Sequence, residues 1–574
     1  MILPDIWGQG GIFSYSAAYG KCKNNEAFSA RLLGDKPGLV FDTKNKCTLY
    51  VYADSIEDVV FSTVMTDFID ATIKIDSGEY KVSFIFADCD TVVITSDYAV
   101  ELKCEFEKNF NSKKGKKATI YTSESETFAL CSKKKDGILT YVFSYGKNAG
   151  DKCVEILEKN PADMVQEKEN FYKNLPELRI PNERIEKLYY RCASVLLAGI
   201  TSPDGIIKSR YITPSKESDA PLMSFWSAFC TLGLRHIAPD VAKETLESIL
   251  ASQAGDGMIS SKVCAKSKSS DINPPILAWC FWELYLINND KGMLENAYGS
   301  LKKYLHYIME TRDINKNHLY EWQIDDSKEF CTCESTMDNS PRFDDGIILD
   351  SIDFTSYMAN EAFYMNLIAD EIDKHGESLY WNVVFERIKG AVNELLFDED
   401  DKIYYDRAVV SGMFKKSKTA ASFLPVFAGV CENRNAMALL RLLNNEDKFN
   451  LKNGVPSVSF DSEDYSDDMF RGPVHMHINY LLSKGLEKYE MHDKANEIKA
   501  KSLEAVMKEY ENTGVLYEYY SPDGEKVSGK LTKKGSSSQG FFFDTQRVNI
   551  RDFAPTAAVI VDILLSKSKK LSSK

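Results

Sequence analysis

Two kinds of hydrophobic pattern divide the chain near residue 175. Before that point, short runs of β-branched and aromatic residues alternate with turn residues and charges, as in Cys47–Tyr52, Tyr80–Phe86, Thr91–Thr95 and Leu139–Tyr145. Runs of this composition and length are typical of β-strands. Several of them in succession predict an N-terminal β-sandwich domain over residues 1–175.

The pattern becomes helical after a charged stretch. Val154–Leu178 is rich in Glu and Lys and precedes Pro181, which predicts a linker helix at the end of the first domain. From Asn182 onward apolar residues return to one face, as in Val241–Leu250. The same period predicts helices over residues 276–287, 293–309, 354–372, 380–396, 436–443, 477–488, 495–510 and 556–566. A second domain of about a dozen helices is expected over residues 182–574, on the scale of a double-layered helical toroid, whereas the lack of an obvious repeat disfavours a solenoid.

The composition is that of a folded protein with an acidic balance of charge. Among 574 residues, 44% are hydrophobic, and 85 acidic against 70 basic side chains leave a formal net charge of −15. This sign, without a basic stripe, argues against nucleic acid as a partner. No run of about 18 apolar residues and no secretion-signal pattern is present, which argues against a membrane partner and export. Thirteen scattered cysteines suit reduced thiols. We expect a cytoplasmic protein, and the oligomeric state stays open.

Carboxylates flanked by aromatic residues gather in three loop regions of the helical part. These regions are Leu319–Trp322 with the following Cys333–Asp345, then Asp468–Tyr480, and finally Leu516–Glu525. Aromatic rings stack on sugar rings, and cleavage of an acetal needs one protonated carboxyl group and one ionised carboxylate. Asp338, beside Asn339, and Glu518, between two tyrosines, form the natural pair. The structural alternatives are that Asp338 caps the turn that follows it and that Glu518 solvates a tyrosine-rich loop.

The segment around Asp338 carries a longer signature. Glu334–Asp344 reads Glu-Ser-Thr-Met-Asp-Asn-Ser-Pro-Arg-Phe-Asp. It resembles the Glu-Ser-Gly-Met-Asp-Asn-Ser-Pro-Arg signature of glycoside hydrolase family 63 and its trehalase-like and mannosylglycerate hydrolase-like relatives. The resemblance continues in the same order through Asn273–Trp279, Ser422–Gly429, Arg471–Val474 with Asn479–Tyr480, and Leu516–Glu525. It therefore covers essentially the whole helical region.

The resemblance implies an (α/α)6 barrel, a six-hairpin toroid, behind an N-terminal β-sandwich, and hydrolysis of α-glycosidic bonds with inversion. It makes Asp338 the general acid that protonates the glycosidic oxygen, and Glu518 the general base that activates a water on the opposite face. The two carboxyl groups of such a pair lie about 6.5–9.5 Å apart to admit this water. The expected function is an inverting α-glycosidase without cofactor or metal, and its substrate is a small carbohydrate, an α-linked oligosaccharide or glycoside with an α-glucoside as the first choice.

Candidate sugar-binding residues accompany this pair. They are Trp226, Trp279, Glu321, Trp322, Glu334, Asn339, Arg342, Arg471, His475 and Tyr517. Arg342 is expected to bind hydroxyl groups and Arg471 to orient the base, while the tryptophans are platforms for sugar rings. The structural alternatives are ion pairs for the arginines and core positions for Trp279 and Trp322. Asp353 matches a family position where a helix cap and a sugar contact are equally open readings.

Three positions depart from the family pattern. Relatives commonly have Trp-Asp where this chain has Trp226-Ser227, Trp where it has His475, and Gly-Trp-Thr-Ala where it has Ala554–Ala557. These departures put the sugar specificity in question and motivate an alternative of another class, a catalytically silent sugar-binding protein on the same fold. A phosphorolytic enzyme is a further alternative, but it needs phosphate where Glu518 would act as base.

Weaker motifs add little to this picture. The pairs Cys331 with Cys333 and His475 with His477 lack the further ligands of a zinc site. Gly535–Gly540 lacks the lysine and the preceding strand of a phosphate-binding loop, and a lid near the base is the preferred interpretation. The glycine-rich segment Asp5–Phe13 either lines the pocket or begins a buried strand.

Overall fold

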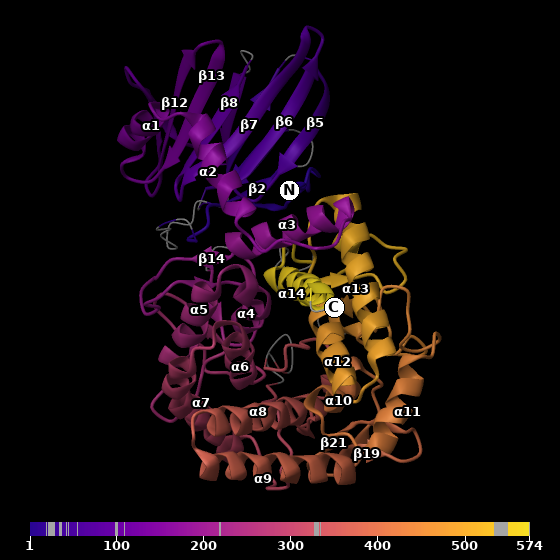
Figure 1. Cartoon of the computed structure of the whole chain (residues 1–574). Helices are drawn as coiled ribbons and strands as arrows, with labels where there is room; N and C mark the ends of the chain where they lie inside the picture. The colour runs from indigo at the N-terminus through magenta and orange to yellow at the C-terminus, as the bar shows by residue number, and fades with distance from the viewer. Residues whose placement is uncertain are drawn as a thin grey trace.

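The computed structural model has a β-sheet region in the N-terminal part of the chain, followed by a helical region (Figure 1). It describes residues 1–574 except 19, 21–28, 34–36, 42, 44, 54, 98–100, 108, 217–219, 326–331, 333, 533–548 and 573–574. This order confirms the coarse organisation predicted from the hydrophobic pattern. Within the described residues, no helix is long and apolar enough to cross a membrane.

The β-sheet region contains two antiparallel sheets. The first sheet has the strand order β1 (Ile12–Phe13), β2 (Ala30–Leu32), β3 (Gly38–Phe41), β4 (Cys47–Tyr52) and β9 (Glu101–Phe106). The second has the order β10 (Asn111–Lys114), β11 (Thr119–Thr122), β12 (Thr127–Lys135), β13 (Ile138–Tyr145), β8 (Thr91–Ser96), β7 (Gly78–Asp88), β6 (Phe68–Ile75) and β5 (Ile56–Val64). All four runs that predicted strands lie in strands of these sheets.

One apolar core joins the two sheets. The ring of Phe41 in β3 lies 5.5 Å from that of Phe143 in β13, and Phe13 in β1 lies 4.9 Å from Phe86 in β7. All four side chains are buried. The sheets therefore pack face to face, with alternate residues of each strand turned inward.

Two helices, α1 (Ala149–Leu157) and α2 (Pro161–Lys173), follow the sheets where one linker helix was expected. The break has a local cause, because the side chain of Asn160 accepts a hydrogen bond from the backbone N–H of Ala162 and proline occupies the first turn of α2. The buried ion pair between Lys168 and Asp67, 2.9 Å, holds α2 against the sheet.

Each helical segment predicted from the sequence coincides with a helix. The helices of this region are α3 (Glu183–Ala198), α4 (Trp226–Ile237), α5 (Pro239–Ala251), α6 (Leu277–Asn288), α7 (Lys291–Thr311), α8 (Ile352–Glu371), α9 (His375–Ala391), α10 (Leu424–Ala428), α11 (Asn433–Leu443), α12 (Met476–Lys488), α13 (His492–Thr513) and α14 (Ala554–Ser572). Short strands lie between them: β14 (Ile200–Thr201), β15 (Tyr211–Ile212), β16 (Leu222–Met223), β17 (Lys262–Val263), β18 (Leu349–Asp350), β19 (Phe397–Asp398), β20 (Ile403–Tyr404), β21 (Asp406–Ala408), β22 (Phe414–Lys415), β23 (Val474–His475) and β24 (Tyr519–Tyr520). Short helical turns are η2 (Pro341–Phe343), η3 (Val392–Leu396), η4 (Ala420–Phe423), η5 (Met469–Arg471) and η6 (Ser528–Lys530).

Alternate helices pack against one another. Helix α4 contacts α6, α6 contacts α8, α8 contacts α10, α10 contacts α12, α12 contacts α14, and α14 contacts α4 again. Of the helices between them, α5, α7, α9 and α13 each contact the helix that precedes them in sequence. The cartoon shows α8 and α9 side by side, and α14 next to α3 and α4 (Figure 1).

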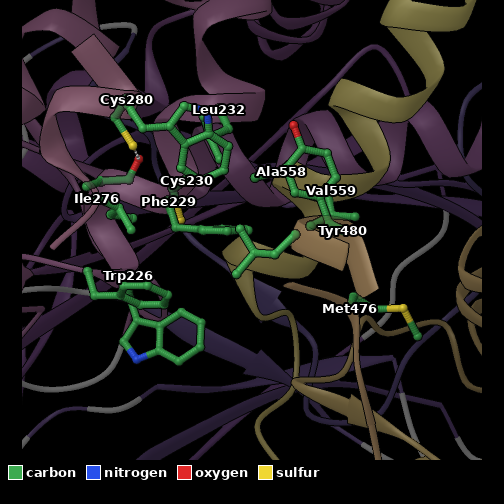
Figure 2. Close-up of a cluster of buried hydrophobic side chains, with 14 of the residues drawn as sticks. Trp226, Phe229, Cys230, Leu232, Ile276, Cys280, Met476, Tyr480, Ala558 and Val559 are labelled. Atoms are coloured by element: carbon green, nitrogen blue, oxygen red, sulfur yellow. Dashed lines mark hydrogen bonds between the residues drawn. The ribbon is translucent and has the colours of Figure 1, made fainter. Parts of the chain in front are cut away.

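The packing between α4 and α14 is especially close. Figure 2 shows Phe229 and Leu232 of α4 in the same cluster as Tyr480 of α12 and Ala558 of α14. A Cβ atom on Gly233 would lie 2.5 Å from the Cα atom of Ala558, so only glycine permits this approach of the two helices. The first and last helices of the contact series are thereby held together.

A buried polar network reinforces the same contact. Arg235 of α4 donates a hydrogen bond of 2.8 Å to Asp562 of α14, and the hydroxyl of Tyr480 in α12 donates one of 2.7 Å to the same carboxylate. Arg235 also pairs with Glu283 of α6. Separating these buried charges would leave them unpaired, which is costly. The network therefore fixes the relative positions of four helices.

Candidate active site

The segment that carries Asp338 is a compact turn held by its own neighbours. The hydroxyl of Ser335 accepts a hydrogen bond of 3.0 Å from the backbone N–H of Met337, and the N–H of Ser340 donates to the carbonyl of Met337 at 3.0 Å. The turn η2 follows, with Pro341 at its first position. Asp338 is half-buried within this turn, whereas its neighbours Met337 and Asn339 are buried.

Arg342 anchors the turn through ion pairs with two buried aspartates. Its guanidinium group donates to both oxygens of Asp353 at 2.9 and 2.8 Å, and to both oxygens of Asp406 at 2.6 and 3.1 Å. A fifth N–H points at the sulfur of Met337, 3.6 Å away. Every donor of this buried side chain is thus used inside the protein. The structure places Arg342 in the ion-pair role and leaves no donor for the sugar hydroxyl contact that was its first interpretation.

A second segment, Asp468–His475, lies directly against the Asp338 turn. The side-chain oxygen of Asn339 accepts a hydrogen bond of 2.8 Å from the backbone N–H of Phe470, and its amide nitrogen donates to the carbonyl of Asp468 at 3.4 Å. Arg471 pairs with Asp344, which lies at the end of the same turn. Asn339 and Arg471 therefore join the two segments.

His475 connects this segment to the one that carries Glu518. Strand β23 pairs with β24 so that His475 lies opposite Tyr519, and the ring of His475 lies 3.8 Å above that of Phe470, nearly parallel to it. Its Nε2–H donates to the carbonyl of Met469 at 3.0 Å, which fixes the orientation of the ring. Glu518 immediately precedes Tyr519 in the chain. The segments that carry Asp338 and Glu518 therefore both contact Asp468–His475.

The backbone of Glu518 is held on its other side by residues that follow it in the chain. Its N–H lies 3.2 Å from the carbonyl of Ile550 and 3.2 Å from the side-chain oxygen of Asn549. The amide nitrogen of Asn549 donates to the carbonyl of Tyr519 at 2.6 Å. Glu518 itself is 5% exposed. A nearly buried carboxylate on a braced backbone has the fixed position that a general base needs.

Aromatic side chains surround this junction. The ring of His477 lies 4.8 Å from Trp226 and 5.6 Å from His475, both edge to face. Trp226 also contacts Phe553 at 5.3 Å. Burial lowers the pKa of His477 well below its ordinary value, so this imidazole is neutral. In Figure 2 the indole nitrogen of Trp226 points away from the other drawn side chains of the cluster.

The profile of a known domain family matches residues 222–543, more than half of the chain, and this family is described as the mannosylglycerate hydrolase MGH1-like glycoside hydrolase domain. The chain belongs to this family. The match includes the Asp338 turn, the Asp468–His475 segment and Glu518. It confirms the resemblance to glycoside hydrolase family 63 and identifies the protein as a member of a hydrolase family that acts on glycosides.

Individual relatives match shorter stretches of this chain. Mannosylglycerate hydrolase MGH1 of Selaginella moellendorffii is 31% identical over 160 residues, 27% of this chain and 29% of the relative. Mannosylglycerate hydrolase of Rubrobacter radiotolerans is 31% identical over 180 residues, 30% of this chain and 35% of the relative. The matched stretches thus span about a third of the length of these relatives.

Solved structures share the fold of the glycoside hydrolase. A family 63 mannosylglycerate hydrolase from Thermus thermophilus, in complex with glucose, superposes with a TM-score of 0.54 at 18% identity and covers 66% of this chain and 99% of its own. A bacterial glucoamylase complexed with acarbose reaches a TM-score of 0.62 at 12% identity, over 99% of this chain and 95% of its own. The second match extends over the β-sheet region as well as the helical region.

Four of the sequence-predicted sugar-binding residues are built into the core. Trp279 and Trp322 are 1% and 2% exposed; the indole N–H of Trp279 donates to Glu283, and that of Trp322 donates to Asp353. Glu334 accepts hydrogen bonds from Arg312, Ile272 and Gln323, and Glu321 accepts one from the backbone of Ile314. Both tryptophans therefore occupy the core positions that were their structural alternative. Asp353 binds Arg342 and Trp322 near the start of α8 and is fully buried.

Tyr517 immediately precedes Glu518 and is buried. Its side chain is 3% exposed, its N–H donates to the hydroxyl of Tyr520 at 3.0 Å, and its carbonyl accepts from the hydroxyl of Thr556 at 2.8 Å. Burial raises the pKa of the Tyr517 phenol. The hydroxyl groups of Tyr520 and Thr556 thus hold the backbone of Tyr517 just before Glu518.

The support of the Glu518 backbone by later residues was not predicted from the sequence. Asn549 and Ile550 follow Glu518 by about thirty residues, and no spacing rule links a loop carboxylate to residues at that distance. The only signal was their place just before the apolar helix α14. Cys331, Cys333 and Gly535–Gly540 lie outside the described residues. In the part that is described, no group of three His, Cys, Asp or Glu residues is arranged to hold a metal ion.

Proposed function

We propose that this glycoside hydrolase is an inverting α-glycosidase in which Asp338 is the general acid and Glu518 the general base. The observation that carries the proposal is that the Asp338 turn and the Glu518 segment both dock on Asp468–His475, through Asn339 and through the pairing of β23 with β24. Contact of both segments with one stretch of chain supports a site in which two carboxylates from distant parts of the sequence act together, the arrangement used in acetal hydrolysis.

The proposed reaction is a single displacement. Asp338, in its protonated form, donates its proton to the glycosidic oxygen as the bond from C1 to that oxygen breaks. Glu518, ionised, removes a proton from a water whose oxygen forms the new bond to C1 from the opposite face. The water oxygen ends on the β face of a sugar that was α-linked, and the two carboxyl groups finish with their protonation states exchanged.

The helical region is proposed to be an (α/α)6 barrel over residues 182–574, behind a β-sheet domain over residues 1–175. The closed succession of contacts from α4 through α6, α8, α10, α12 and α14 back to α4 supports this architecture. Six inner helices with a second layer outside them place the loops of one barrel end around a central site. We assign the Asp338 turn and the Glu518 segment to two such loops.

The substrate proposed is a small α-linked oligosaccharide or glycoside, with an α-glucoside as the first choice. The curated relatives are named mannosylglycerate hydrolases, so an α-mannosyl glycerate is the second substrate class to test. Trp226 is the proposed platform for a sugar ring, because it lies in the aromatic cluster at the junction and is the most exposed of the three candidate tryptophans at 9%. The expected cytoplasmic location stays a prediction.

The test is sugar release from a panel of α- and β-linked glucosides, mannosides and mannosyl glycerate, with the anomer formed first followed by NMR. Asp338→Asn and Glu518→Gln are each expected to lower turnover by about 10²–10⁴-fold, the usual contribution of a general acid or base. Glu525→Gln, at an exposed position of the same loop, is the matched control and keeps wild-type turnover.

Release of a β-anomer from an α-linked substrate, lost in both variants, supports the proposal. First release of the α-anomer contradicts inversion, and undiminished turnover of either variant removes that residue from the mechanism. No release from any substrate, with sugar binding intact, supports the silent sugar-binding alternative instead.

A further inference from the structure

One buried carboxylate, Asp552, holds three distant parts of the chain together. Its Oδ2 atom accepts hydrogen bonds from the backbone N–H of Ile12 and from Nη2 of Arg191, both at 2.6 Å. Its Oδ1 atom accepts a hydrogen bond of 3.2 Å from the backbone N–H of Leu516. Its side chain is fully buried. The three donors belong to strand β1 of the β-sheet region, to helix α3 and to the segment that leads to Glu518.

The segment Ile550–Phe553 runs antiparallel to the segment that carries Glu518. The N–H of Phe553 donates to the carbonyl of Leu516 at 3.2 Å, and the N–H of Glu518 donates to the carbonyl of Ile550 at 3.2 Å. These two bonds flank Asp552 and form a short antiparallel ladder between the segments. A displacement of Asp552 is therefore transmitted through the backbone to Glu518.

The N-terminal segment packs closely against the residues that lead to Glu518 and against Arg551. A Cβ atom on Gly8 would lie 2.6 Å from the carbonyl oxygen of Gly514 and 2.7 Å from Cγ1 of Val515. Arg551 donates from Nη1 to the carbonyl of Gln9 at 2.8 Å. The first residues of the β-sheet region thus press directly on the start of the base segment and on the residue next to Asp552.

A purely local role does not explain these contacts. Asp552 lies two residues before α14, where an aspartate commonly caps a helix. The hydrogen bonds of its carboxylate come instead from Ile12, Arg191 and Leu516. Its backbone has φ = +52°, a conformation that Asp and Asn tolerate better than other residues with side chains. The position of the Asp552 carboxylate is therefore explained by its bonds to β1, α3 and the segment that leads to Glu518.

We propose that Asp552 is a positioning residue for Glu518, and that through it the N-terminal segment Gly8–Phe13 sets the position of the general base. This inference rests on the proposed role of Glu518. It gives the β-sheet region a part in the chemistry: the region supplies no reacting group, but its first strand is one of the supports that hold the base at a fixed distance from the acid.

Two variants test the link by independent means. Asp552→Asn removes the charge that pairs with Arg191 and keeps the shape and the backbone preference of the side chain. Gly8→Ala changes no charge and forces the N-terminal segment away from Gly514. Gly299→Ala is the matched control, because a Cβ atom there meets nothing within 4 Å. Should Asp552→Asn fail to fold with its buried arginine unpaired, Gly8→Ala still tests the proposal.

The assay compares the substrate found in the panel with the α-glycosyl fluoride of the same sugar, whose leaving group needs no proton. Both variants are expected to lower kcat by about ten- to hundred-fold, the effect of a catalytic group displaced by up to 1 Å. The KM value is expected to stay within two-fold. The defect is expected to persist with the fluoride, as it does for Glu518→Gln, whereas Asp338→Asn recovers on that substrate. Rates are normalised to the folded fraction measured by near-UV circular dichroism.

Two results overturn the inference: a wild-type kcat in folded Gly8→Ala and Asp552→Asn, or recovery of both on the fluoride. Failure of the proposed function gives a different result. If Glu518→Gln keeps its turnover, the role of Glu518 as base is refuted, and the positioning role falls with it. If Glu518→Gln is inactive while the two variants keep their kcat, only the positioning role is refuted.

Discussion

Replacement of Arg342 by lysine tests the packing beneath the Asp338 turn. Arg342 donates four hydrogen bonds of 2.6–3.1 Å to Asp353 and Asp406, and its side chain is 1% exposed. Lysine keeps the charge but presents a single ammonium group, which cannot bridge two carboxylates in the same geometry. Each lost hydrogen bond to a charged group costs about 1.5–3 kcal/mol. The loss of two therefore lowers the free energy of unfolding by about 3–6 kcal/mol, which overlaps the range of about 3–5 kcal/mol found when buried ion pairs are broken.

The measurement is urea unfolding followed by tryptophan fluorescence, to which Trp322 contributes through its contact with Asp353. Arg434→Lys is the matched control, because Arg434 is 66% exposed and pairs with Glu399 and Glu432 at the surface. An exposed pair is worth less than about 1 kcal/mol. If Arg342→Lys costs no more than this control, the bridge between the two carboxylates is not what holds the turn.

Three further changes have outcomes of their own. Burial, together with the neighbouring charge of Asp350, raises the pKa of Glu321 to about 8, whereas the unfolded chain ionises near 4.3; the contribution of this group to stability is therefore present at low pH and is lost as the pH rises between these values, by ~1 kcal/mol per pH unit. Glu321→Gln is expected to remove this slope from urea unfolding measured between pH 5 and 8, and an unchanged slope contradicts the assignment. Gly233→Ala is expected to lower stability by about 1–3 kcal/mol in calorimetry by overpacking α4 against Ala558; an unchanged thermal midpoint shows that the helices separate freely. Trp226→Leu is expected to raise the dissociation constant of the sugar product in isothermal titration, and an unchanged constant excludes Trp226 as a platform.

The elements of the fold were largely predictable because their hydrophobic periods are local. Val241–Leu250 and the other helical segments bury one face of each helix, and this places apolar residues every three or four positions whatever the tertiary partner is. The break between α1 and α2 was missed, although Asn160 and Pro161 together form a recognisable helix start. The closure of α14 on α4 depends on one glycine, and a single glycine in a helix carries no sequence signal of its partner.

The candidate site was predictable only as far as its motif reached. Asp338 and Glu518 were found because each lies in a distinctive run of residues. Which of the neighbouring side chains belong to the core and which to the site could not be predicted. A tryptophan or an arginine in the sequence does not show whether it packs in the core or lines a site. Trp322 became a core residue through its bond to Asp353, and Arg342 became a bridge between carboxylates. Such partnerships form between residues that only the fold brings together.

The contact between α4 and α14 has a consequence for synthesis of the protein. Residues 226–237 and 554–566 lie more than 300 positions apart in sequence and pack at backbone distance. Contacts between residues so far apart in sequence form late in folding, because the entropy cost of closing a long loop precedes the stabilisation that the contacts give. During translation, α4 therefore leaves the ribosome long before α14. The apolar side chains of α4 shown in Figure 2 are not covered by α14 during this time. A nascent chain in this state exposes the surface that chaperones bind, and the supports of Glu518 assemble only after Asp552 and α14 have been made.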